Sequence, residues 1–245
     1  MTTETPRTVE KKVRQEPSEA PSLQGKLNWL RAGVLGANDG IVSTAGIVVG
    51  VSGATLTGHS LLAAGIAGMI AGALSMAAGE YVSVSTQRDT ERAALDKERL
   101  LLAEDPEGEL DMLTHRIEQS GVKPKLARHV AIQLTAQDAL AAHAQWELGI
   151  DPDEIVNPWH AAFASMMSFI AGAVIPLLTI ILTPTAIAVP ATVVAVTVAL
   201  AITGTVSARL GGAAGFPATV RNIAGGLLAM GITYGIGVAV GTIGM

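Results

Sequence analysis

Five long apolar stretches are separated by polar segments along the chain. They lie at residues 30–51, 60–82, 159–182, 186–208 and 217–243. Each is close to the roughly 20 residues that cross a bilayer as a helix. The third and fourth contain no Asp, Glu, Lys or Arg and are joined by Leu-Thr-Pro-Thr-Ala, which predicts a tight turn. The pattern favours an all-α membrane protein with five transmembrane helices over a soluble protein with a buried helical hairpin.

The long polar segment between the second and third stretches has a helical pattern of its own. Strong helix formers continue the second stretch and stop near Pro106. A second helix is predicted from there to Gly121, and a third from Pro124 to near Gly149. We therefore predict a three-helix insert at 88–157, between transmembrane regions at 26–87 and 158–245.

Basic residues near the ends of the stretches predict the orientation. The basic residues that flank the stretches fall on one side of the membrane at every alternate crossing. They are Lys26, Arg31, Arg88, Arg92, Arg209 and Arg221. Because cytoplasmic loops carry the excess of Lys and Arg, the N-terminus and the insert are expected in the cytosol and the C-terminus outside. Residues 1–25 are polar without an apolar signal region, which predicts a disordered cytosolic tail. A bacterial inner membrane is the expected location, with a plant or fungal vacuole as the alternative.

Composition excludes several classes of function. The chain has no cysteine, so disulfides and thiolate metal sites are ruled out. Residues 81–154 hold 15 acidic and 8 basic residues, which disfavours nucleic acid as a partner. No phosphate-binding Gly-rich loop and no hydrolase motif is present, so neither a nucleotide partner nor an enzyme is expected.

Asp39 is the one acidic residue in the first apolar stretch. It lies about 13 Å past Leu30 at roughly 1.5 Å per residue, within the apolar layer, where an ionisable group is costly and usually functional. The alternative is that the helix starts later and Asp39 caps it. In the second stretch Met69 and Met76 share a helix face, and Glu80 lies near its cytosolic end. Thioethers and carboxylates can line a cation path, although methionine is more often simple packing.

The insert holds a second set of candidate ligands. His143 and Glu147 are four residues apart and so face one direction on a helix. Glu98, Glu107 and Glu109 flank Pro106, where a turn can fold two helices together. Carboxylates that converge from several helices of a bundle can hold iron or manganese. From the spacing alone, a solvated acidic face is the simpler interpretation.

Several longer stretches resemble the vacuolar iron transporter family, including its nodulin-21-like and bacterial members. They are AGVLGANDGIVSTAGIVVGV, AGMIAGALSMAAGEYVSVSTQRDTE, WELGIDP and VTVALAITG. The resemblance runs from about Leu30 to the C-terminus. It implies a five-helix homodimer that moves Fe²⁺, and often Mn²⁺, out of the cytosol in exchange for protons, with no prosthetic group. It also implies that Asp39 and Met76 line a path between the subunits.

The resemblance further implies that the insert binds metal through glutamates around its proline. Glu98, Glu109 and Glu147 match that pattern, but Leu101 and Met112 stand where members with the full set carry glutamates. His143 and Ala144 replace a methionine pair, and Gly68 replaces a glutamate that some members carry. The predicted metal residues are therefore Glu98, Glu109, Glu147, His143 and Met112, a thinner site than in those members.

Three hypotheses follow for the function. The leading one is a proton-coupled exporter of divalent metal ions. The second is a membrane-tethered metal-binding or ferroxidase-like protein that acts through the insert, but the Glu-x-x-His pairs of di-iron bundles are missing. The third is a structural membrane protein, which explains neither Asp39 nor the acidic insert.

Overall fold

The structure is a computed structural model that describes residues 23–54, 58–152 and 157–243. The described residues form helices and connecting turns, without a strand. In chain order the elements are α1 (Leu23–Gly53), α2 (Gly58–Glu104), α3 (Pro106–Gln119), α4 (Pro124–His143), the π-helix η1 (Ala144–Leu148), α5 (Pro158–Leu182), α6 (Thr185–Leu210) and α7 (Gly215–Ile243). The all-α prediction is confirmed. The predicted tail lies outside the described residues as far as residue 22, and α1 already includes residues 23–25.

Five of these helices are long and apolar enough to cross a membrane, as predicted. They contain the spans Ala32–Gly53, His59–Glu104, Pro158–Leu182, Thr185–Leu210 and Gly215–Ile243. Large apolar side chains on their outer faces, such as Leu182, Phe216 and Ile243, are highly exposed. In a membrane protein, lipid covers such apolar faces, so they need not be buried inside the protein.

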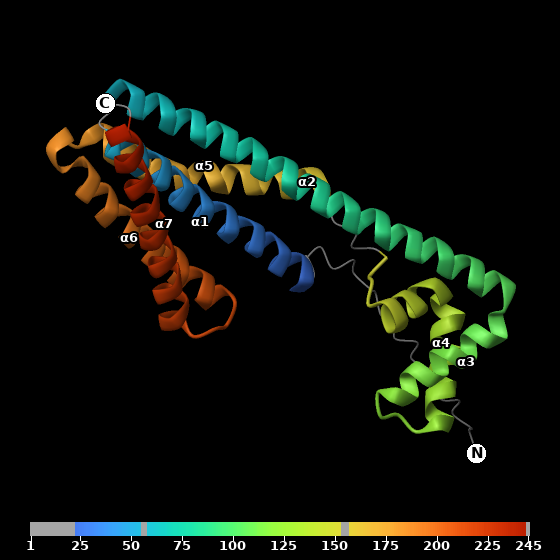
Figure 1. The fold of residues 1–245 in the computed structure, drawn as a ribbon. Helices are drawn as coiled ribbons and strands as arrows, with labels where there is room; N and C mark the ends of the chain where they lie inside the picture. Colours follow the sequence, from blue (N-terminus) through green and yellow to red (C-terminus); the bar gives the residue numbers. More distant parts are fainter. Residues whose placement is uncertain (1–22, 55–57, 153–156, 244–245) are drawn as a thin grey trace, which may run out of the picture.

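Helix α2 is continuous over 47 residues. At about 1.5 Å per residue it measures roughly 70 Å, more than twice the roughly 30 Å hydrocarbon layer. Figure 1 shows it running from the bundle of α1, α5, α6 and α7 to α3 and α4 at its far end. The prediction that the second membrane helix continues into the insert is therefore confirmed.

Helix α1 lies at the centre of the bundle and contacts α2, α5, α6 and α7. Its contact with α5 is a close approach of the two backbones, where glycines replace side chains. A Cβ on Gly40 would lie 2.0 Å from the carbonyl oxygen of Phe169, and a Cβ on Gly172 would lie 2.1 Å from that of Ala37. Small residues allow membrane helices to approach at backbone distance, so this contact depends on those glycines.

The insert folds on a small core of its own. Leu113 and Ile117 of α3 pack against Ala127 and Ala131 of α4. Helix α3 begins with Pro106, and the Asp105 carboxylate accepts a hydrogen bond from the Gly108 amide at 3.0 Å, which caps the helix. The sequence predicted a third helix in the insert from Pro124 to near Gly149. The bounds of that prediction are confirmed, but α4 is interrupted at Asp138 and the last turn is the π-helix η1.

Candidate metal centre and transport path

Four side chains from four elements meet at the junction of α2 and the insert. They are Glu98 of α2, Glu109 of α3, His143 at the end of α4 and Glu147 of η1. The Nδ1 atom of His143 lies 3.0 Å from Glu98 Oε1, 3.6 Å from Glu109 Oε2 and 2.9 Å from Glu147 Oε1. The interpretation as a solvated acidic face is therefore wrong for these residues.

The side chains of the cluster are almost fully buried. The His143 side chain is 0% exposed, and the three carboxylates are 7% or 8% exposed. One oxygen of each carboxylate and both His143 nitrogens are buried without a hydrogen-bond partner. Buried polar atoms are rarely left unpaired, and three carboxylates repel one another unless a cation lies between them. These buried atoms lie close together without a hydrogen bond, an arrangement that fits a bound metal ion.

Burial and charge change the proton affinity of Glu147. Burial raises its pKa above the ordinary value of 4.5, although the neighbouring His143 favours the charged form. The charges of Glu98 and Glu109 add to the rise, and Arg116 opposes it. A proton therefore competes with a metal ion for this carboxylate at a higher pH than at an exposed one.

The donor atoms suit a borderline divalent ion. One ligand atom from each residue can be chosen so that all four lie within 4.8 Å of one another. Ligands on opposite sides of one ion are about 4.2 Å apart when each bond is roughly 2.1 Å, so a small contraction closes the site. Carboxylate oxygens with one imidazole nitrogen are common ligands of Fe²⁺ and Mn²⁺.

Met112, the fifth predicted metal residue, is more exposed than the four cluster residues. It lies on α3 three residues after Glu109 and is 44% exposed. Glu107 also lies on α3 and is exposed. Glu98, Glu109, His143 and Glu147 are thus the predicted metal residues that the fold brings together.

A second candidate site is a hollow on the membrane part of α1 and α2. It has a volume of about 590 Å³ and is lined by Asp39, Met76 and Glu80, together with Ser43 and Ser75. Asp39 lies in the middle of α1, so the alternative in which it caps the helix is wrong. Its carboxylate is exposed at the surface of this single chain.

The two predicted methionines have different surroundings. Met76 lines the hollow and also packs against the buried ring of Phe169. Met69 does not line the hollow, and instead packs between the cluster of Val48 and Leu177 and the cluster around Phe169. The sequence reasoning missed Ser43 and Ser75, although Ser43 is four residues from Asp39 and Ser75 precedes Met76.

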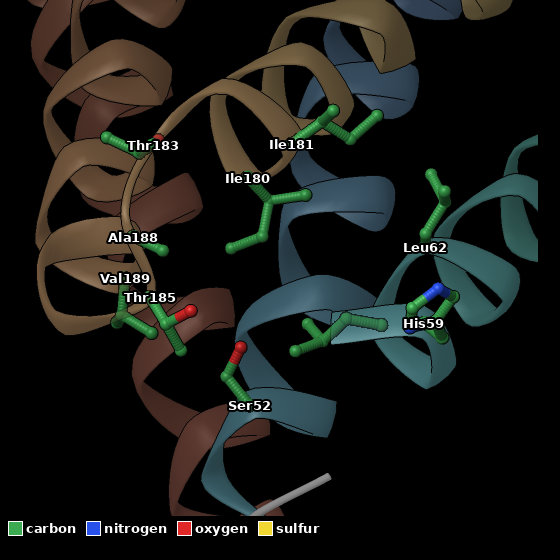
Figure 2. A pocket seen from close by; sticks show the side chains of 10 residues that line it. Ser52, His59, Leu62, Ile180, Ile181, Thr183, Thr185, Ala188 and Val189 are labelled. Carbon is green, nitrogen blue, oxygen red and sulfur yellow. The ribbon is translucent and has the colours of Figure 1, made fainter. Parts of the chain in front are cut away.

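A further cavity of about 550 Å³ lies at the far end of the bundle from the insert. Figure 2 shows Ser52, His59 and Thr185 around it, with Ile180 and Val189 on its walls. Among the residues that the structure describes, the only group of three or more acidic or histidine side chains suited to a metal ion is the cluster at the insert. This cavity therefore has no comparable ligand set.

The fold and the two sites define a class: a helical multi-pass membrane protein with an intramembrane acid and a buried carboxylate–imidazole cluster on an extended helix. The model of the VIT family matches residues 30–238. The chain belongs to this family.

Several named relatives are similar in sequence to this chain over most of their length. The chain is 46% identical over 217 residues to "Vacuolar iron transporter" of Acanthamoeba castellanii, which covers 88% of this chain and 80% of that protein. It is 37% identical over 212 residues to "Vacuolar iron transporter homolog 1" of Oryza sativa subsp. japonica, covering 86% and 73%. It is 31% identical over 244 residues to "Vacuolar iron transporter homolog 2.1" of Arabidopsis thaliana, covering 99% and 95%. These relatives are named as transporters, which agrees with the expectation that the chain is not an enzyme.

Proposed function

We propose that this protein moves Fe²⁺ or Mn²⁺ out of the cytosol in exchange for protons. The observation that carries the proposal is the buried cluster of Glu98, Glu109, His143 and Glu147, whose buried polar atoms make no hydrogen bond and fit a divalent cation. The names of the relatives support iron as a substrate. The imidazole and carboxylate ligands suit both metals, so manganese remains in the proposal.

The path across the membrane is proposed to run through the hollow at Asp39. A carboxylate in an apolar layer can hold either a proton or a metal ion, which gives a chemical basis for exchange. Met76 offers a soft sulfur ligand beside it, and Glu80 lies at the end of the hollow nearer the insert. In this proposal the ion is captured in the insert and then passes along α2 to the hollow.

The working form is proposed to be a homodimer with the hollow at its interface. Asp39 is exposed in a single chain, and a bare carboxylate facing lipid is unfavourable. The neighbouring surface of α2 carries small exposed residues such as Ala71, Ser75 and Gly79, which allow another helix to approach closely. A second copy of the chain would cover both features.

The proposed location is a bacterial inner membrane, with the N-terminus and the insert in the cytosol and the C-terminus outside. The alternation of basic residues at the helix ends supports this orientation. The quoted relatives are eukaryotic proteins with vacuolar names, and a vacuolar membrane would keep the same topology relative to the cytosol.

The experiment that tests the function is metal transport into proteoliposomes with an imposed pH gradient. The vesicles contain a dye that metal quenches, and Fe²⁺ and Mn²⁺ are offered separately to wild type and Asp39→Asn. We expect gradient-dependent quenching in wild type and at least a tenfold slower rate in the variant, which keeps the size of the side chain but cannot ionise. Glu98→Gln is the companion variant, because it weakens the insert cluster and leaves the membrane path intact.

Each outcome has a clear meaning. Transport that persists in Asp39→Asn would contradict the role of Asp39. If folded, inserted wild type moves neither metal but consumes oxygen with Fe²⁺, and Asp39→Asn does not change that rate, the ferroxidase-like alternative would replace the transporter.

A further inference from the structure

Two members of the metal cluster, His143 and Glu147, follow a break in α4. Asp138 has φ −159° and ψ 102°, which is extended backbone inside an otherwise helical segment. Its Oδ1 atom accepts a hydrogen bond from the amide of Ala141 at 2.9 Å. A side-chain acceptor three residues before the donor is the geometry of a helix N-cap. Asp138 therefore ends one helical segment and starts another.

Helix geometry shows why the break matters. At about 100° per residue, an unbroken helix would place His143 about 160° around the axis from Ala127. Ala127 is completely buried against α3, so His143 would lie on the opposite face of α4, away from that core. In the structure the His143 side chain is instead 0% exposed and lies among three carboxylates. The change in direction at Asp138 resolves this contradiction.

The segment after the break is held at both ends. It starts at the Asp138 cap and ends at Gly149, whose φ of +66° is the left-handed conformation that glycine adopts easily. Between these two points η1 contacts α2 and α3, which carry Glu98 and Glu109. A π-helix inside a helical segment is frequently found at a functional site, and here it carries Glu147.

We propose that Asp138 is a positioning residue for the metal cluster, because its break and its cap turn His143 and Glu147 towards Glu98 and Glu109. The inference rests on the proposed function, since it requires that the cluster binds metal. Asp138 itself is not a ligand, because its carboxylate is used by the Ala141 amide and is not one of the four cluster groups.

The test compares Asp138→Asn with Asp138→Gln in the full-length protein. Both variants are neutral amides, but Asn is a good N-cap and the longer Gln is a good helix former that caps poorly. Mn²⁺ affinity is measured from the loss of the free Mn²⁺ signal in electron paramagnetic resonance. We expect Asn to bind like wild type and Gln to bind about tenfold more weakly, the lower end for groups that orient metal ligands.

Two controls separate positioning from general damage. Ser120→Ala removes a 2.6 Å hydrogen bond to the Ile117 carbonyl at the end of α3, in the same insert but outside the cluster, and should leave Mn²⁺ affinity unchanged. In a Glu147→Gln background the ratio between the Asn and Gln variants should shrink, because one of the ligands that Asp138 positions has already been replaced.

Equal affinities of the Asn and Gln variants would overturn the positioning role, and so would an unchanged ratio in the Glu147→Gln background. Absence of Mn²⁺ binding by wild type would instead overturn the metal site itself, and the role of Asp138 with it. The metal-free melting temperatures of both variants show whether each is folded, and a Gln variant that binds weakly only because it is unfolded would also count against the proposal.

Discussion

At the scale of single residues, the insert gathers charged groups where solvent cannot stabilise them. His143 is fully buried, and the three carboxylates around it are almost so. Such a group of acids is unfavourable in an apolar setting unless a cation or protons neutralise it. These four residues are therefore the ones that we propose bind a metal ion.

The raised pKa of Glu147 predicts a pH dependence of metal binding. Metal needs the deprotonated carboxylate, so affinity is highest above the raised pKa and falls as the pH drops through it. We expect Mn²⁺ affinity to begin falling at a pH above the range set by an ordinary carboxylate pKa of 4.5. Isothermal titration calorimetry with Mn²⁺ at several pH values measures this.

The control for that prediction is Glu147→Gln, which removes the titrating group at nearly constant size. Its affinity should be lower at neutral pH and should change less as the pH is lowered. A variant that keeps the full pH dependence of wild type would show that another group of the cluster is responsible.

At the scale of elements, the contact between α1 and α5 depends on the absence of side chains. The backbones approach so closely that a Cβ on Gly40 would overlap the Phe169 carbonyl. The spacing Gly36/Gly40 in the sequence indicates such a contact. Gly231/Gly235 has the same spacing, but a Cβ on either of these glycines would meet no atom of another helix within 4 Å. The spacing alone therefore cannot tell which glycine pair is packed.

These two pairs give a matched stability test. Gly40→Ala should destabilise the protein by about 1–3 kcal/mol or more, because the added methyl meets backbone that cannot move away easily. Gly231→Ala adds the same methyl in open space and should be neutral or slightly stabilising. Thermal unfolding of the purified protein in detergent compares the two, and equal melting temperatures would contradict the close approach.

At the scale of the whole molecule, the long helix α2 connects the two candidate sites. Glu80 near the membrane hollow and Glu98 in the insert cluster are on the same helix, about 27 Å apart at roughly 1.5 Å per residue. Figure 1 shows the insert held away from the membrane bundle by this helix. In the proposed function, capture of an ion and its passage through the membrane therefore take place in different parts of the protein.

A cross-linking experiment tests the proposed dimer. The chain has no cysteine, so Ser75→Cys introduces a single thiol beside the hollow. If two copies meet there, mild oxidation in membranes should produce a covalent dimer. Phe216→Cys places an exposed thiol at the start of α7 and should remain mostly monomeric. The reverse result would move the interface to α7.

The sequence by itself determined the five membrane helices, the helical insert and the continuation of α2 into it. Those features follow from hydrophobicity, helix formers and prolines, which act locally along the chain. It also indicated Glu98, Glu109, His143 and Glu147 as metal residues, the glutamates through resemblance to a family. Their convergence into a buried cluster was decided only by the tertiary structure, since it depends on contacts among α2, α3, α4 and η1.

The break at Asp138 shows the same limit most clearly. Neither glycine nor proline marks it, and the local sequence reads as continuous helix. Helix propensity is a weak preference of a few tenths of a kcal/mol per residue, and tertiary packing overrides it. The helices were therefore readable from the sequence, whereas the direction of the last one, and with it the geometry of the metal site, was set by packing and by one side-chain cap.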